Sequence, residues 1–457
     1  MSPAAARAGA GRPGAATPEE TATVAGLTHE GEGVVHGGKT VFVAGALPGE
    51  RIRFRRTRRH RQHDEGVLIE VLEAAPERVA PRCKHFGVCG GCALQHLEPR
   101  VQLAAKEHEL KDNLERVARV EPRQWLAPLS GPAWGYRRRA RLGAKFVRKK
   151  GCVVVGFRER AAPYVAQLES CAVLAAPAAE LITPLAQLLN ELTIREQLPQ
   201  IEVAVADNAT ALVLRVLQAP APADLVRLEA FAAQHAVRLL LQPAGLESVS
   251  ALGPAAEPLY YRLGDFDLTL EFAPTDFIQV NGPVNEALVA RAVQLLELTP
   301  GARVLDLFCG LGNFTLALAR RAGSVVGVEG ETALIERARA NAARNGVVNA
   351  QFHVANLAAD VRGLAWLKGS FSHVLLDPPR SGAREVLPVL AALAPERLLY
   401  ISCHPGSLAR DLGVLVHEHG MRLEAAGVVD MFPHTAHVES LALLTRAAPR
   451  PATAAPA

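Results

Sequence analysis

The second half of the chain, from about residue 300, alternates short apolar runs with stretches of helical spacing. The runs RVLDLF, SVVGVE, AQFHVA, SHVLLD and RLLYIS have the composition of strands, and most of them are followed by an Ala- and Leu-rich helical segment. Because parallel strands need a long crossover connection, usually a helix, this order predicts a doubly wound, mostly parallel α/β sheet. Ligands of such sheets bind at the carboxyl ends of the strands.

The chain of 457 residues is longer than one hydrophobic core usually supports, so several domains are expected. Short apolar runs between Gly- and Pro-containing turns predict a small antiparallel β-barrel near the N-terminus, followed by a mixed α+β region. The expected boundaries are a disordered tail at 1–20, the barrel at 21–80, the α+β region at 81–273, the α/β domain at 274–447 and a second tail at 448–457. Residues 102–118 predict an amphipathic helix that packs on the α/β domain.

Charge is distributed unevenly along the sequence, although the net charge is only +4. Residues 51–61 hold seven arginines and residues 137–150 hold eight basic residues, and neither run contains an acid. Two such runs favour a surface that binds nucleic-acid phosphates, and a solvated face is the alternative. The sequence has no apolar run of about eighteen residues and no secretory signal, so we expect a cytoplasmic protein.

A glycine-containing turn follows the first strand of the α/β domain, in the stretch VLDLFCGLGNF at 304–314. Asp306 closes the strand, and Gly310 and Gly312 allow the backbone to bend and to approach a ligand closely. Glu329 closes the next strand, where a carboxylate can accept the ribose hydroxyls of a nucleoside. The third glycine of GxGxxG is missing, which disfavours a dinucleotide.

Two later motifs also follow strands. DPPRSG at 377–382 places Asp377 at a strand end, and its two prolines stiffen the loop that follows. In YISCHPGSLARDL at 400–412, Cys403 ends an apolar strand directly before a Pro-Gly turn and a helix. A helix N-terminus favours a thiolate, so Cys403 is a candidate nucleophile, and a buried structural cysteine is the alternative.

The stretch CKHFGVCGGC places three of the chain's seven cysteines, Cys83, Cys89 and Cys92, in a Cx5CxxC spacing. Cys171 can supply a fourth ligand through folding. Thiols of a cytosolic chain stay reduced, so metal binding is a better interpretation than disulfides. The spacing alone leaves zinc and an iron–sulfur cluster both open.

Five motifs occurring in one order resemble the family of uracil-C5 RNA methyltransferases: DFIQVN (276–281), 304–314, 377–382, SCHP (402–405) and DMFPHTAHVE (430–439). The resemblance implies a Rossmann-like class I methyltransferase domain that uses S-adenosylmethionine. It also implies that the methyl donor is contacted by Gln279, Phe308, Asn313, Glu329, Asn356 and Asp377. It makes Cys403 the nucleophile and Glu439 the base, and Phe277 the side chain that stacks on the target base.

The chemistry of the reaction explains these residue types. C5 of uracil becomes nucleophilic only after a thiolate adds to C6, and a base must then remove the C5 proton so that the cysteine can leave. His404 departs from the family pattern, which usually has asparagine there, and this puts in question the hydrogen bonding beside the nucleophile. A cytosine-C5 enzyme is disfavoured, because such enzymes typically carry a second cysteine in a PC dipeptide and this chain has DPPR.

The N-terminal half resembles particular members of the same family. Members with this cysteine arrangement carry a [4Fe-4S] cluster on four positions that match Cys83, Cys89, Cys92 and Cys171. Residues 21–78 resemble a TRAM domain, an OB-like β-barrel that binds RNA, and 30–52 is the matching stretch. The pairing of the two implies an enzyme that methylates uracil 1939 of 23S ribosomal RNA, and we expect it to be a monomer. The alternatives are another rRNA or tRNA uracil, or an iron–sulfur RNA-binding protein without catalysis.

Overall fold

The computed structural model describes residues 18–160, 162–254 and 256–446, which form two compact units. One unit holds the residues up to Ala80 together with His96–Glu98, and the other holds Pro81–Gln95 and everything from Pro99 onward. The expected tails at 1–20 and 448–457 lie outside the described residues, except for the end of the first one. Strand β1 already begins at Glu19, because this part of the chain pairs with strand β4.

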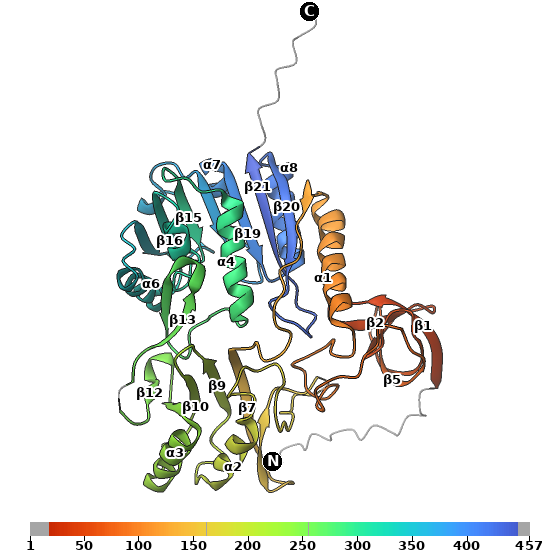
Figure 1. Cartoon of the computed structure of the whole chain (residues 1–457). Helices are drawn as coiled ribbons and strands as arrows, with labels where there is room; N and C mark the ends of the chain where they lie inside the picture. The colour runs from red at the N-terminus through yellow and green to blue at the C-terminus, as the bar shows by residue number, and fades with distance from the viewer. Residues whose placement is uncertain (1–17, 161, 255, 447–457) are drawn as a thin grey trace, which may run out of the picture. The chain divides into compact units, whose positions relative to one another are not determined.

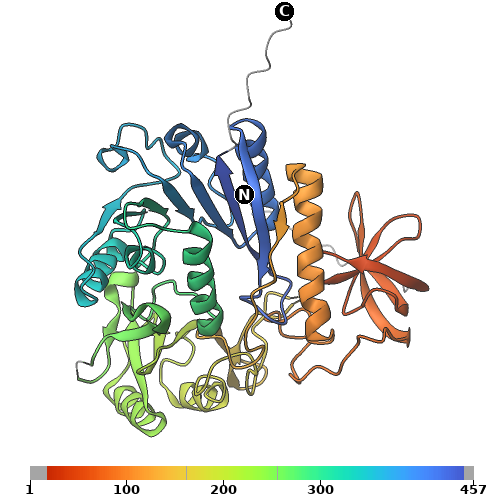
Figure 2. The same cartoon turned by 45° about the horizontal axis from the view of Figure 1, so that its top comes forward.

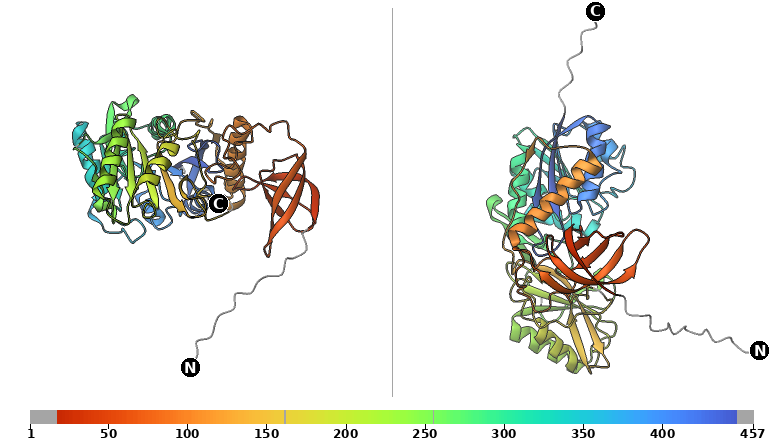
Figure 3. Two further views of the ribbon diagram at one scale, coloured as in Figure 1. Left: turned by 90° about the horizontal axis from the view of Figure 1, so that it is seen from below. Right: turned by 90° about the vertical axis from the view of Figure 1, so that its right-hand side faces the viewer.

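The first unit is a closed five-stranded barrel, visible as the curled red strands in Figure 3. Its strands are β1 (Glu19–Leu27), β2 (Glu32–Val35), β3 (Val41–Ala44), β4 (Arg51–Arg59) and β5 (Asp64–Glu73). Alternate residues point inward, as the period of a strand requires, and the buried set includes Val41, Val43, Ile52 and Phe54. The barrel predicted from the apolar runs is therefore confirmed, although it is not wholly antiparallel, because β3 and β5 pair in parallel.

The arginine run at 51–61 contains no acidic residue, but in the folded barrel acidic side chains of the neighbouring strands lie beside it. It forms most of β4, and the neighbouring strands bring carboxylates against several of its side chains. Arg56 binds Glu20 and Asp64 at 2.7 and 2.9 Å and is mostly buried. Ion pairs also engage Arg51, Arg53 and Arg58. Part of this run stabilises the barrel and is not a free phosphate-binding surface.

The second unit begins with a six-stranded sheet flanked by two helices, in the lower part of Figure 1. Its strands, in spatial order, are β12 (Ser250–Ala251), β11 (Val237–Gln242), β10 (Thr210–Arg215), β9 (Gln200–Val205), β7 (Arg139–Val147) and β8 (Cys152–Gly156). The helices are α2 (Ile182–Glu191) and α3 (Pro222–His235). Several basic residues of the 137–150 run again meet acids, as in the pairs Arg138–Asp207 and Arg141–Glu202.

The remaining part of this unit is an eight-stranded sheet. Its parallel strands are β15 (Arg303–Leu307), β16 (Ser324–Glu329), β17 (Ala350–Val354), β18 (His373–Leu376) and β19 (Arg397–Ser402). The sequence did not indicate that the sheet continues through the antiparallel strands β21 (Glu439–Arg446) and β20 (Met421–Val429) to the short β6 (Gln124–Trp125). Its helices are α4 (Gly282–Leu296), α5 (Thr315–Ala319), α6 (Thr332–Arg344), α7 (Leu387–Leu393) and α8 (Pro405–His417).

Two segments that precede this sheet in the sequence pack against it. The helix predicted at 102–118 is α1 (Pro99–Asn113) followed by a π-helical turn, and it lies beside β20 and α8 (Figure 2). The hairpin β13 (Leu259–Leu263) and β14 (Leu268–Phe272) packs on α6, although its sequence position suggested the α+β region. None of the helices in the described ranges combines the length and apolarity needed to cross a membrane.

Candidate active site

Three carboxylates gather at the carboxyl ends of the central parallel strands. Asp306 lies near the end of β15, Glu329 ends β16 and Asp377 follows β18. Burial, together with the charges of Asp377 and Glu329, raises the pKa of Asp306 to about 7. Burial likewise raises the pKa of Asp377 to about 7. This end of the sheet is therefore strongly negative when ionised and suits a ligand that carries positive charge.

The turn after β15 adopts the conformation expected of a ligand-binding loop. Phe308, Gly310 and Gly312 have positive φ angles of 64°, 55° and 97°. The N–H of Gly310 donates to Oε2 of Glu329 at 3.2 Å, so the loop and the next strand are joined directly. A non-glycine residue such as Phe308 takes this conformation only where the surroundings enforce it, which is common at binding sites.

The other residues that were predicted to contact the methyl donor differ in how they are held. The amide of Asn313 exchanges two hydrogen bonds with Asn285, at 2.9 and 3.0 Å, and accepts one from the Tyr261 hydroxyl. Asn356 is exposed, and its Oδ1 accepts from the N–H of Ala358. Gln279 is half-buried in the segment between β14 and α4. Asn313 is thus rigidly built, and Asn356 lies on a surface turn.

Phe277, the predicted stacking residue, lies in the same segment as Gln279 and is 72% exposed. Exposing an apolar phenyl ring to water is unfavourable, and an exposed ring is free to stack on an aromatic ligand.

The candidate nucleophile Cys403 lies directly after β19 and before α8. Its neighbour His404 is the N-cap of α8, and Nδ1 of the imidazole accepts from the N–H of Ser407 at 3.1 Å. An asparagine oxygen commonly makes this bond at an N-cap. The departure from the family pattern at His404 therefore preserves the helix cap beside the nucleophile.

Strand register places the candidate base opposite the candidate nucleophile. In the antiparallel pair of β19 and β21, Ser402 is opposite Ser440. The next position along each strand is Cys403 and Glu439, respectively. The two residues therefore follow directly on the last paired positions, and the charge of Glu439 acts on the Cys403 thiol. Backbone pairing thus brings together two residues that are 36 positions apart in the sequence.

The pair occupies a buried and negatively charged environment. Burial and the charge of Asp377 raise the pKa of Glu439 to about 8, and the ammonium of Lys106 opposes this shift. Burial and the charges of Glu439 and Asp377 raise the pKa of the Cys403 thiol, against the effect of Arg380. Within the described ranges no group hydrogen-bonds to Oε2 of Glu439, so this buried oxygen is available to accept a proton.

Lys106 was not identified from the sequence. It lies on α1, is 3% exposed and contacts the loop that leads into Glu439. The one available signal was its spacing of four residues from Gln102 and Leu110, which are also buried.

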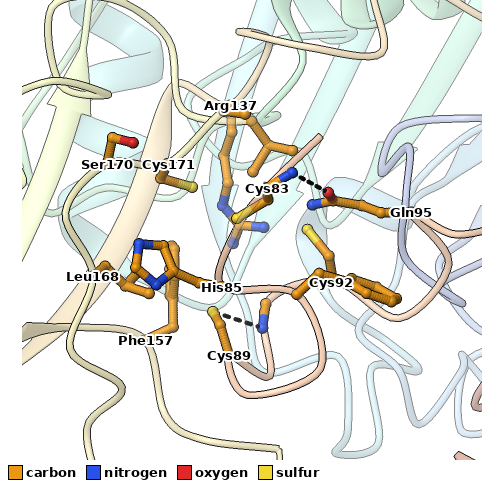
Figure 4. Close-up of a pocket in the computed structure, with 14 residues that line it drawn as sticks. Cys83, His85, Cys89, Cys92, Gln95, Arg137, Phe157, Leu168, Ser170 and Cys171 are labelled. Atoms are coloured by element: carbon orange, nitrogen blue, oxygen red, sulfur yellow. Dashed lines mark hydrogen bonds between the residues drawn. The ribbon is translucent and has the colours of Figure 1, made fainter. Parts of the chain in front are cut away.

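The four cysteines assigned to a cluster line one pocket in the α+β region (Figure 4). The sulfur atoms of Cys83, Cys89, Cys92 and Cys171 face its interior, and the guanidinium-bearing Arg137 also lines it. Among the described residues, no set of three or more potential ligands is arranged to hold a metal ion. Folding therefore gathers the four thiols around one pocket, as the sequence suggested.

The buried thiols of this pocket hold their protons strongly. Burial, with a contribution from the neighbouring cysteines, raises the pKa of Cys89 to about 11 and that of Cys92 to about 12. A metal that binds here must displace these protons, because the thiolate is the ligand.

Comparison with known proteins places the chain in a family. A family described as tRNA (Uracil-5-)-methyltransferase matches residues 260–447. A protein of Alkalilimnicola ehrlichii, named 23S rRNA (uracil(1939)-C(5))-methyltransferase RlmD, is 52% identical over 93% of this chain and 96% of its own length. The chain belongs to the uracil-C5 RNA methyltransferase family. Proteins of the same name from Xanthomonas oryzae pv. oryzae and Stenotrophomonas maltophilia are 50% and 48% identical, each over 94% of this chain and 98% of the relative. The resemblance based on the five motifs is confirmed.

A solved structure supports the fold of this uracil-C5 methyltransferase family member. The crystal structure of Pyrococcus abyssi tRNA (uracil-54, C5)-methyltransferase in complex with S-adenosyl-L-homocysteine matches with a TM-score of 0.72 and 25% identity. The match covers 93% of this chain and 100% of that one. The predicted class I methyltransferase fold is therefore confirmed.

Proposed function

We propose that this protein methylates C5 of a uracil in 23S ribosomal RNA, the one numbered 1939, with S-adenosylmethionine as methyl donor. The relatives that share about half of their residues with it carry this activity in their names. The observation that carries the chemistry is the proximity of Cys403 and Glu439, which directly follow the last β19–β21 pair, Ser402 and Ser440, and whose charges interact. A thiol and a carboxylate at the mouth of the sheet are the two groups that the reaction needs.

In the proposed mechanism the Cys403 thiolate adds to C6 of the uracil, which makes C5 nucleophilic. The bound donor supplies a methyl group that is transferred to C5. Glu439 then takes the proton from C5, the double bond between C5 and C6 re-forms, and the Cys403 thiolate leaves. A base whose pKa is raised to about 8 has a proton affinity suited to this task near neutral pH.

The donor site is proposed at the three carboxylates of the parallel strands. Glu329, already bound to the Gly310 N–H, would accept the ribose hydroxyls, and Asp377 would lie near the sulfonium. Oδ1 of Asp306 is buried without a hydrogen-bond partner among the described residues, so this oxygen is available to accept a hydrogen bond at this end of the sheet. Donor contacts are assigned on the family pattern to Gln279, Phe308, Asn313, Glu329, Asn356 and Asp377.

The same proposal assigns a [4Fe-4S] cluster to Cys83, Cys89, Cys92 and Cys171. The proposal is supported by the one pocket that the four cysteines line together, because a [4Fe-4S] cluster takes four cysteine thiolates, one on each iron. Four thiolates can also hold zinc, and the resemblance of the sequence to cluster-carrying family members is what favours iron. Bound there, the cluster would join the 83–92 segment to Cys171 and stabilise the fold.

RNA contacts are proposed for the barrel, as a TRAM domain, and for Phe277, which would stack on the target base. The barrel is closed and carries basic side chains on β4. The 72% exposure of Phe277 supports its role, because a stacking platform must be open to the base.

The proposal is tested with two variants that separate the steps. Cys403→Ala removes the attack on C6, so neither methylated product nor a protein–RNA adduct should form. Glu439→Gln leaves attack and methyl transfer possible, so a methylated RNA should remain bound to Cys403 through denaturing electrophoresis. An adduct or product from Cys403→Ala would refute the assignment of the nucleophile.

Mass spectrometry of ribosomal RNA from cells with and without the gene identifies the target. We expect one methyl group to be missing, at uracil 1939 of 23S rRNA. Loss of a methyl group from tRNA alone would exclude the proposed substrate, and no change in any RNA would favour a binding protein without catalysis.

A further inference from the structure

Helix α1 buries a polar face against the methyltransferase sheet. Gln102, Lys106 and Leu110 follow one another at four-residue spacing, so they lie on one face of the helix, and all three are buried. The helix packs against β20 and α8 (Figure 2). Lysine is almost never fully buried unless it is paired, so the buried Lys106 is expected to have a polar or acidic partner.

Lys106 binds the start of the loop at residues 430–438, which connects β20 to β21. Its Nζ donates to Oδ1 of Asp430 at 2.7 Å and to the carbonyl oxygen of Phe432 at 2.9 Å. Because the ammonium is 3% exposed, the ion pair is shielded from water and its geometry is fixed. The 430–438 loop is thereby held at its first turn.

Gln102 binds the middle of the same loop. Its Oε1 accepts from the N–H of His434 at 3.0 Å, and its Nε2 lies 3.2 Å from Nδ1 of the imidazole and 2.9 Å from the carbonyl oxygen of Leu94. His434 has a φ of +65°, a conformation that a non-glycine residue keeps only when its surroundings impose it. Trp134 stacks on the His434 ring at 3.8 Å and completes this support.

The 430–438 loop ends at Glu439, where the charge of Lys106 acts directly. The groups that face Glu439 are Lys106 from α1, Asp377 after β18 and the Cys403 thiol after β19. Asp377 favours the protonated form of Glu439, and Lys106 favours the ionised form. A glutamate that stays protonated cannot accept the C5 proton.

We infer that Gln102 and Lys106 are positioning residues that fasten the 430–438 loop, which leads into Glu439, and that the nearby ammonium of Lys106 favours the ionised, proton-accepting form of Glu439. This inference rests on the proposed function, in which Glu439 removes the C5 proton. It assigns a role in the last step of the reaction to a helix far from the methyltransferase motifs in the sequence.

The test is the variant Lys106→Met, which keeps the length of the side chain and removes its charge. Single-turnover reactions with substrate RNA and S-adenosylmethionine would follow the formation and decay of the protein–RNA adduct as a function of pH. Formation should continue, because Cys403 is retained. Decay near neutral pH should slow about tenfold, and its midpoint should move to higher pH by about one unit, since that shift corresponds to a tenfold change in the ionised fraction of Glu439.

Lys111→Met is the matched control, because Lys111 lies on the same helix with 54% of its side chain exposed. This variant should behave as the wild type does. Lys106→Arg, which keeps the positive charge, should restore most of the decay rate and return the midpoint toward that of the wild type. A purely structural role for Lys106 would change the amount of folded protein and leave the pH midpoint unmoved.

Asp430 would be left unpaired in Lys106→Met, so the double variant Lys106→Met/Asp430→Asn provides the same measurement without a lone buried charge. It too should show the midpoint shift. Decay with the wild-type rate and midpoint in this variant would overturn the inference while the proposed function stands. A wild-type protein that forms no adduct and methylates no uracil would instead overturn the proposed function.

Discussion

His404 shows how one side chain can replace another without changing the geometry beside the nucleophile. Its Nδ1 accepts the Ser407 N–H at 3.1 Å, the bond that an asparagine oxygen makes at an N-cap. His404→Asn should therefore keep both stability and adduct formation. His404→Ala should lower the free energy of unfolding by about 1 kcal/mol, measured by urea denaturation. Equal destabilisation by both substitutions would contradict the capping role.

The pH dependence of the reaction follows from the two opposed residues. Both reactive forms are the deprotonated ones, and the surroundings raise the pKa of Cys403 and raise that of Glu439 to about 8. The rate at which free methylated RNA is released, which needs both groups deprotonated, should therefore rise as the pH increases through about 8 and fall as the pH decreases below it. Because the two groups interact, the midpoint belongs to the pair. A single-turnover rate that is constant between about pH 6 and about pH 9 would disprove this expectation.

At the scale of the element, strand β4 separates structural arginines from those available to RNA. Arg56 is held by Glu20 and Asp64, whereas no ion pair among the described residues engages Arg55, Arg59 or Arg61. The available arginines are the ones expected to contact phosphates.

Replacing Arg55, Arg59 and Arg61 together by alanine should weaken RNA binding. In a plot of the logarithm of affinity against the logarithm of salt concentration, the slope should become less steep by about 0.7–0.9 for each phosphate that is no longer neutralised. Arg51→Ala with Arg53→Ala is the matched control, because both side chains are paired with acids. An unchanged salt dependence in the triple variant would mean that β4 is a solvated face.

The strands and helices of the methyltransferase sheet could be predicted because each is specified locally by apolar spacing. The motif residues could be found for the same reason, since each motif is contiguous. The role of α1 could not be predicted from the sequence. Gln102 and Lys106 have the composition of a solvated face, and only their distant partners Asp430 and His434 explain their burial. The pairing of β21 with β19 was equally invisible, because strand order is set by tertiary contacts.

At the scale of the whole second unit, the cysteine pocket and the 430–438 loop share neighbours. The N–H groups of Ala93 and Leu94, directly after Cys92, donate to the carbonyl oxygen of His434 at 2.9 and 3.0 Å. The hydroxyl of Tyr136 donates to the carbonyl oxygen of Pro433 at 3.1 Å. The segment after Cys92 is therefore hydrogen-bonded directly to the loop that leads into Glu439.

The metal content of the purified protein tests whether the four cysteines of this pocket hold a cluster. Protein purified without oxygen should contain about four irons per chain and absorb broadly in the visible range, as a cluster on four cysteines requires. Cys171→Ser should lose the iron and melt at a lower temperature, because a ligand that binds only the folded state stabilises it. Cys152→Ser is the matched control, since Cys152 is a half-buried free cysteine on β8 outside the pocket. Full iron content in Cys171→Ser, or stoichiometric zinc in place of iron in the wild type, would refute a cluster held by these four cysteines.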